Sequence, residues 1–313
     1  MQAATSFQSA PAGRLPSTMQ VLERGWLSSN NVLFSGRDGS ALIDSGYLTH
    51  APQTLALVQH GLQGRALDRL INTHLHSDHC GGNAILQDFY GCHTAIPASE
   101  ADKVRCWDVD ALSFQATGQQ CARFGFDGTL APGDTLTLGE LQWQVLGAAG
   151  HDPHSLIFYC LEERILISAD ALWQNGFGVI FPELGGESGF LEARATLELI
   201  SGLDLRLVIP GHGAPFTDVE EALARAFSRL AYLAADPLRN AENAVKVLLK
   251  FILLERQQVA LADVCTLLMA IPAVSDANLR FLHKTPQELA QWAVAQLLRA
   301  GAARVQGDLL HNE

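Results

Sequence analysis

The stretch INTHLHSDHCGG, residues 71–82, places three histidines and one aspartate within six positions. Each of these side chains is costly to bury without a partner, so hydrophobic packing does not explain the cluster. His74 and His76 are two residues apart and project to the same side of an extended chain, where both can hold one ion. Asp78 and His79 follow where the chain turns toward two glycines, and they can face a second position. The spacing therefore predicts two neighbouring metal ions.

The sequence before this motif predicts short strands and a helix. A hairpin with strands at 30–34 and 41–44 ends in Asp44, and a helix is expected at 51–61. A short apolar strand then runs directly into the histidines, and a helix and another strand follow them. Alternation of strand, helix and strand indicates an α/β fold.

Three more residues that can bind metal lie farther along the chain. His151 follows a predicted strand at 141–147, Asp170 ends the apolar strand 165–168, and His212 lies just past the strand in LRLVIPGHG. A helix is expected between the last two, near 188–201. All three residues therefore lie at strand ends, where α/β scaffolds place their functional groups.

Composition limits the classes of function. The 313 residues are 48% hydrophobic and 17% charged, and the formal net charge of −12 repels phosphate backbones, so nucleic-acid binding is not expected. No apolar run is long enough for a membrane span, and the N-terminus does not resemble a secretory signal. The cysteines form no Cys-x-x-Cys pair, so reduced thiols and a cytoplasmic location are expected, with Cys80 as a packing residue.

The chain is expected to divide into three parts. Residues 1–18 are rich in Ala, Ser, Pro and Gln and are predicted to form a loose arm. A catalytic domain is expected at 19–235, in which 99–124 is either an insertion that overhangs the site or an ordinary connection. Residues 242–313 are expected to form a small, mostly helical domain. Its predicted elements are helices at 242–257, 261–270 and 285–301 and a hairpin about Gly307.

The C-terminal part does not have the charge pattern of a DNA reader. Residues 241–313 contain seven Lys or Arg and seven Asp or Glu, and the last predicted helix has only Arg299 as a basic residue. A helix that reads DNA needs basic and amide groups facing the groove. We therefore expect a cap over the site or a homodimerisation module.

The order His74-x-His76-x-Asp78-His79, followed by His151, Asp170 and the Pro-Gly-His-Gly motif of His212, resembles the metallo-β-lactamase-fold hydrolases, and in particular their glyoxalase II-like branch. The C-terminal helices and hairpin resemble the winged-helix addition of some members. The resemblance implies an αββα sandwich with two divalent metal ions, zinc above all, with iron or manganese as alternatives. The implied ligands are His74, His76 and His151 for the first metal; Asp78, His79 and His212 for the second; Asp170 as the bridge between them; and Asp44 as a support from behind.

The resemblance also implies a hydrolase. A hydroxide held between the two metals is the expected nucleophile, with Asp78 and Asp170 as catalytic carboxylates. The expected substrate is a small acyl compound, foremost a thioester, although no basic residues can be assigned to hold glutathione. A phosphodiesterase or ribonuclease, a lactone or β-lactam hydrolase, and a metal-loaded regulatory protein without activity are the alternatives. His154 is a candidate for contact with the substrate.

Overall fold

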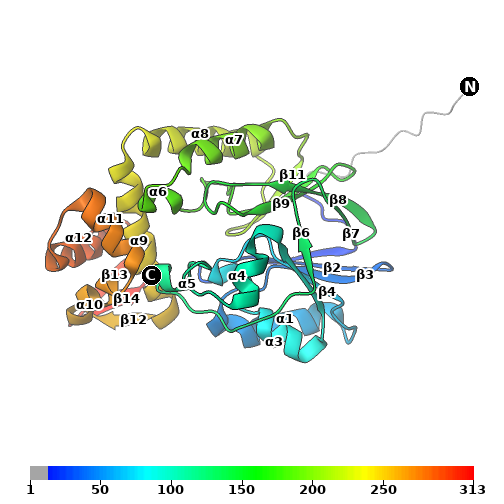
Figure 1. Ribbon diagram of the computed structural model, residues 1–313, viewed down its shortest axis with the longest axis horizontal. Coiled ribbons are helices and arrows are strands. Elements are labelled where there is room, and N and C mark those ends of the chain that lie inside the picture. Colours follow the sequence, from blue (N-terminus) through cyan, green and yellow to red (C-terminus); the bar gives the residue numbers. More distant parts are fainter. Residues whose placement is uncertain (1–12) are drawn as a thin grey trace, which may run out of the picture.

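The computed structural model describes residues 13–313. Two β-sheets pack face to face, and helices cover the outer face of each sheet (Figure 1). The layers are therefore helix, sheet, sheet and helix, which confirms the predicted αββα sandwich. Of the predicted N-terminal arm, residues 1–12 lie outside the described residues.

The first sheet has six strands within the described residues. The pairs β3–β4, β4–β5 and β5–β6 are parallel, whereas the first three strands pair in antiparallel fashion. In sheet order the strands are β1 (Met19–Leu22), β2 (Asn31–Gly36), β3 (Gly39–Ile43), β4 (Arg69–Ile71), β5 (His93–Pro97) and β6 (Gly128–Leu130).

The second sheet has five strands in the same part of the chain, and of these only β10 and β11 pair in parallel. In sheet order they are β11 (Leu207–Pro210), β10 (Ile165–Ala169), β9 (Leu156–Cys160), β8 (Leu141–Gly147) and β7 (Thr135–Leu138).

Successive side chains of a strand point to opposite faces of its sheet, so one strand supplies both the core between the sheets and the core under the outer helices. On β2, Val32 and Phe34 point between the sheets, whereas Leu33 packs under the outer helices. Trp143 of β8 is completely buried between the sheets, with its ring edge-on to Phe34 and its Nε1 donating to the Leu138 carbonyl at 3.1 Å. This indole satisfies its one polar group inside the core, as a buried tryptophan must.

Helices on both outer faces complete the sandwich. They are α1 (Ala51–Leu62) and α3 (Asn83–Tyr90) on the first sheet, and α7 (Phe190–Ser201) and α8 (Val219–Ala234) on the second. The shorter helices between strands are α2 (Ser77–Cys80), α4 (Ala101–Cys106), α5 (Phe114–Thr117) and α6 (Pro182–Gly185).

The C-terminal region packs beside the sandwich around the long helix α9 (Pro237–Arg256) (Figure 1). Its apolar core is separate from the cores of the sandwich. The remaining elements are β12 (Gln258–Ala260), α10 (Val264–Met269), α11 (Pro272–Ala277), a π-turn over Asn278–Leu282, α12 (Pro286–Arg299), β13 (Ala303–Gln306) and β14 (Leu309–Asn312).

Two expectations for this region need correction. Helix α9 begins at Pro237 instead of 242, because the Asp236 side chain caps the backbone N–H of Leu238 and proline fits the first turn. Helix α11 and strand β12 were not expected at all. The hairpin about Gly307 and the helix capped by Thr285 are confirmed. The domain limits themselves remain a prediction.

Within residues 13–313, no single helix has the length and apolar character of a membrane span. In this part of the chain, the segments Leu261–Met269 and Pro272–Leu282 are long and apolar enough only when they are taken together, and they are bent by 87° relative to each other.

Candidate metal centre

The loops that follow five strands meet at one edge of the sandwich. Asp44 directly follows β3 and Asp170 directly follows β10. His74 lies three residues after β4, His151 four residues after β8, and His212 two residues after β11. Because the strands hold these loops in place, side chains that are far apart in the sequence come together at this edge.

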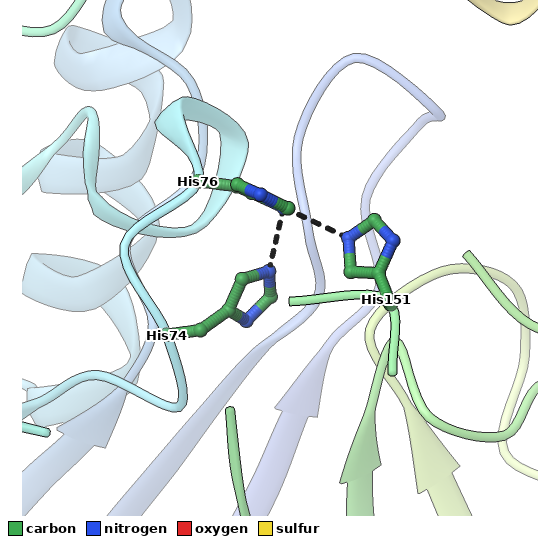
Figure 2. A group of neighbouring side chains, drawn as sticks. All are labelled: His74, His76 and His151. Carbon is green, nitrogen blue, oxygen red and sulfur yellow. Dashed lines mark hydrogen bonds between the residues drawn. The ribbon is translucent and has the colours of Figure 1, made fainter. Parts of the chain in front are cut away.

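The first group consists of His74, His76 and His151, whose rings converge (Figure 2). His76 Nδ1 lies 3.2 Å from His74 Nε2 and 2.8 Å from His151 Nε2. All three side chains are buried. Three imidazole nitrogens that face one point are the usual donor set of a zinc ion.

The second group consists of Asp78, His79, Asp170 and His212, whose ligand atoms lie within 4.8 Å of one another. Asp78 and His79 are on the short helix α2, and their side chains meet Asp170 after β10 and His212 after β11. His212 Nε2 lies 3.1 Å from Asp78 Oδ2, and His79 Nε2 lies 3.4 Å from Asp170 Oδ1.

Asp170 lies between the two groups. Its Oδ1 faces His79, whereas its Oδ2 lies 3.3 Å from His151 Nε2 in the first group. Gly211 leaves room for this carboxylate, because a Cβ at that position would lie 2.3 Å from Asp170 Oδ1. A carboxylate with one oxygen toward each group is placed to bridge two cations.

Hydrogen bonds behind the ligands determine which ring nitrogen is free to bind metal. His79 Nδ1 donates to Asp44 Oδ2 at 2.8 Å, and His151 Nδ1 donates to the Val179 carbonyl at 2.5 Å. The Thr73 hydroxyl donates to Asp44 at 2.8 Å, so it accepts from His74 Nδ1 at 3.0 Å. In the neutral form of each of these three histidines the proton therefore lies on Nδ1, and Nε2 is the nitrogen available to a metal ion.

Burial and neighbouring charges shift the pKa values of these groups. Burial, aided by neighbouring histidines, holds the pKa of His74 well below its usual value and lowers the pKa of His151 to about 4. For His79, burial acts against protonation, but Asp170, Asp44 and Asp78 outweigh it and raise the pKa. Burial acts against ionisation of Asp170, yet the neighbouring histidines hold its pKa well below the usual range. The shifts of His74, His151 and Asp170 favour the neutral imidazoles and the ionised carboxylate that bind metal, whereas a metal ion at His79 would have to replace a proton.

The residues fit two divalent cations. Inside the site, His79 Nε2 is a buried polar atom without a hydrogen-bond partner among the described residues. An orphaned imidazole nitrogen is unfavourable unless another group satisfies it. Imidazole nitrogens and carboxylate oxygens together suit zinc and iron, and the donor set does not select between them. The predicted ligands are thus brought together in two adjacent groups.

A cavity opens onto the site and is walled mainly by apolar side chains. The loop after β10 contributes aromatic residues such as Trp173 and Phe177, and helix α9 contributes Val247 and Phe251. Trp26 stacks on the ring of His212, with 5.5 Å between ring centroids and an angle of 3° between planes. The C-terminal region is therefore part of the cavity wall.

The segment 99–124 reaches this cavity as well. Thr117 and Gln119 line it, and Gln119 also accepts a hydrogen bond from the Ser77 hydroxyl, at the start of α2. The segment 99–124 is therefore an insertion that overhangs the site and not an ordinary connection.

His154 lies outside both ligand groups. It lines a neighbouring cavity that also touches His76 and His151, and its Nε2 is 3.5 Å from Glu100 Oε1. A contact with substrate from this position remains a prediction. Cys80 is fully buried beside the site and, as expected, is not in either group.

Sequence reasoning missed the residues that shape the cavity. Trp26 lies in the loop between β1 and β2, and Arg229 and Asn243 lie on helices α8 and α9. None of them belongs to a local motif, because only the fold brings them to the site. The one available signal was the position of Trp173, three residues after the ligand Asp170.

The structural comparisons show the same fold. A metallo-beta-lactamase family protein from Thermus thermophilus is 19% identical and has a TM-score of 0.58. The match covers 96% of this chain and 100% of that one. A protein solved in a di-iron-bound form is 25% identical with a TM-score of 0.53, over 66% of this chain and 98% of that one.

Curated relatives are named hydroxyacylglutathione hydrolase. The protein from Hyphomonas neptunium is 28% identical over 44% of this chain and 50% of its own length, and the one from Rhizobium etli is 25% identical over 56% of each. The chain thus spans about half the length of these relatives. A family model described as the metallo-beta-lactamase superfamily matches residues 24–212, more than half of the chain, and this range includes all seven predicted ligand positions. The chain therefore belongs to the metallo-beta-lactamase superfamily.

Proposed function

We propose that the protein is a dinuclear metal-dependent hydrolase that acts on a small acyl substrate, specifically a thioester. The observation that carries this proposal is the position of Asp170, with one oxygen toward His79 and the other toward His151. That arrangement supports two ions held side by side at the mouth of a cavity. The names of the curated relatives support the choice of a thioester.

The ligands would divide as the two groups do. His74, His76 and His151 would hold one ion, Asp78, His79 and His212 the other, and Asp170 would bridge them. When bound, such ions supply Lewis acidity and make water nucleophilic at neutral pH. We propose zinc, with iron and manganese as alternatives that the same donors accept.

The chain's own residues orient and transfer protons. Asp44 keeps the proton of His79 on Nδ1, away from the site. The Asp78 carboxylate lines the cavity and is the group placed to take a proton from attacking water. The side chains of Trp173, Phe177 and Phe251 limit the access of bulk water to the reacting carbonyl.

The cavity favours an acyl compound over a nucleic acid. Helix α9 closes one side with Val247 and Phe251, and Arg229 is the only Lys or Arg among its described lining residues. A nuclease instead needs an open basic groove for successive phosphates. A cytoplasmic location and a homodimer through the C-terminal region remain predictions, and light scattering of the pure protein tests the dimer.

The test compares initial rates on an acyl-glutathione thioester and on an aryl phosphodiester, with metal-loaded protein and with Asp170→Asn as the blank. We expect thioester hydrolysis that the blank lacks. Cleavage of the phosphodiester alone would favour the phosphodiesterase or ribonuclease. Rates on a lactone and a β-lactam check those alternatives, and inactivity on all four would favour a regulatory protein.

A further inference from the structure

Arg229 occupies an unusual position in the cavity wall. It comes from helix α8, and its guanidinium reaches helix α9, where one nitrogen donates to Asn243 Oδ1 at 3.3 Å. Its Cζ is 5.8 Å from the centre of the Phe177 ring, and its methylene chain packs on Gly176, where a Cβ would lie 3.0 Å from Cδ. The side chain is thus held between apolar walls by one hydrogen bond.

This guanidinium has no carboxylate partner. No ion pair joins Arg229 to an acid within residues 13–313, and residues 1–12 contain no Asp or Glu. Its Nε is buried and has no hydrogen-bond partner among the described residues. Burial lowers the pKa of Arg229, and no neighbouring acid counters that effect. A partly buried cation without a counter-ion is costly, and an anionic ligand removes that cost.

The neighbouring Arg225 shows the contrast. It lies one turn earlier on the same helix, where it donates to Asp218 Oδ2 and to the Gln174 carbonyl at 2.8 Å each. Arg225 is satisfied by the protein and does not line the cavity. The unpaired arginine is therefore the one that faces the space where substrate would bind.

We infer that Arg229 is the anion-binding anchor of the substrate pocket, and that the substrate is an acyl compound whose apolar body ends in a carboxylate. The planar guanidinium binds a carboxylate through two parallel hydrogen bonds. The cavity that Arg229 shares with the candidate metal ligands is also lined by Phe177, Val247 and Phe251, whose side chains suit a hydrocarbon or aromatic spacer. The reaction itself rests on the proposed function, because the anchor only selects which acyl compound is hydrolysed.

The kinetic test uses matched thioesters of one neutral thiol. Succinyl, glutaryl and adipoyl thioesters are compared with the corresponding terminal amides on wild type, Arg229→Gln and Arg225→Gln. We expect wild type to prefer the best carboxylate over its amide by about 10- to 100-fold in kcat/KM, the range of one charged hydrogen-bonded pair. Arg229→Gln should lose that preference and retain its rate on the amide, whereas Arg225→Gln should behave as wild type.

A second series moves the carboxylate to the thiol side, as in a thioester of mercaptopropionate. A preference that depends on Arg229 only in this series would place the anion on the leaving group and overturn the acyl assignment. Equal preference in wild type and Arg229→Gln in both series would overturn the anchor itself. Melting temperature and metal content of each variant establish that it is folded and loaded.

A binding measurement separates this inference from the proposed reaction. Glutarate and its monoamide are titrated calorimetrically into the metal-loaded proteins. The anchor predicts that wild type binds the dicarboxylate about 10-fold or more tightly than the monoamide, and that Arg229→Gln does not discriminate. If no thioester is hydrolysed but this discrimination is present, the anchor stands and the proposed reaction fails. If a thioester is hydrolysed but wild type does not distinguish glutarate from its monoamide, the proposed reaction stands and the anchor fails.

Discussion

Asp44 supports the metal centre through His79, whose Nδ1 donates to Asp44 Oδ2 at 2.8 Å. Asp44 also accepts from the backbone N–H and the hydroxyl of Thr73, and that hydroxyl in turn accepts from His74. One carboxylate thus orients a histidine in each ligand group. The backbone of Asp44 is in the left-handed region, with a φ of 58°, and asparagine also tolerates this conformation.

The Asp44→Asn variant tests this support. Asparagine keeps the backbone but replaces an acceptor with an amide, so the proton on His79 Nδ1 loses its charged partner. We expect zinc affinity to fall by about 10- to 100-fold, as for other losses of a partner behind a metal ligand. Competition with a zinc-binding dye measures it. Thr73→Val removes the hydroxyl that joins His74 to Asp44 and should lower zinc affinity as well, and unchanged affinity in both variants would contradict the arrangement.

Gly178 provides a test of His151. A Cβ at Gly178 would lie 2.4 Å from His151 Nδ1, where the ring is held by the Val179 carbonyl. Gly178→Ala should therefore displace the imidazole and release the ion of the first group, with a loss of about 1–3 kcal/mol in stability. Metal analysis and thermal unfolding measure both effects. Gly185→Ala, where a Cβ meets nothing within 4 Å, is the matched control and should retain both metals.

Tyr47 links the sandwich to helix α9 and gives a pH prediction. Its hydroxyl donates to Glu255 Oε1 at 3.2 Å, and burial followed by the charge of Glu255 raises its pKa well above the ordinary value. A raised folded-state pKa stabilises the fold fully below pH about 10, and that contribution is lost as pH rises toward the folded value. Urea unfolding of wild type and Tyr47→Phe should therefore show a stability difference that shrinks above pH about 10. A stability difference between the two proteins that stays constant above pH about 10 would show that ionisation of Tyr47 is not coupled to folding.

Phe251 tests the part that α9 plays in the cavity. Its ring packs edge-on to Tyr47, with centroids 5.0 Å apart, and it lines the cavity together with the loop after β10. Truncation to alanine should raise KM for an apolar acyl thioester by about 10-fold, within the range of a lost hydrocarbon contact. Both metals should remain bound. A variant with unchanged kinetics would show that α9 does not contact the substrate.

The sequence located the residues of both groups, because His74 to His79 form one local motif and His151, Asp170 and His212 each follow a strand. It was insufficient for the cavity, since Trp26 and Arg229 reach it only through the packing of distant segments. The start of α9 was missed although Asp236 and Pro237 are typical of a helix N-terminus, because the polar residues after them suggested a connection. Strand β12 has three residues, too few to show a period of two.

We propose that Asp170 bridges two metal ions. The most direct measurement is the number of metal ions per chain, determined by elemental analysis of wild type and Asp170→Ala after loading with zinc and removal of the excess. We predict two ions in wild type and at most one in Asp170→Ala, with most of the hydrolytic activity lost. An Asp170→Ala protein that keeps two ions and full activity, or a wild type that binds none, would contradict it.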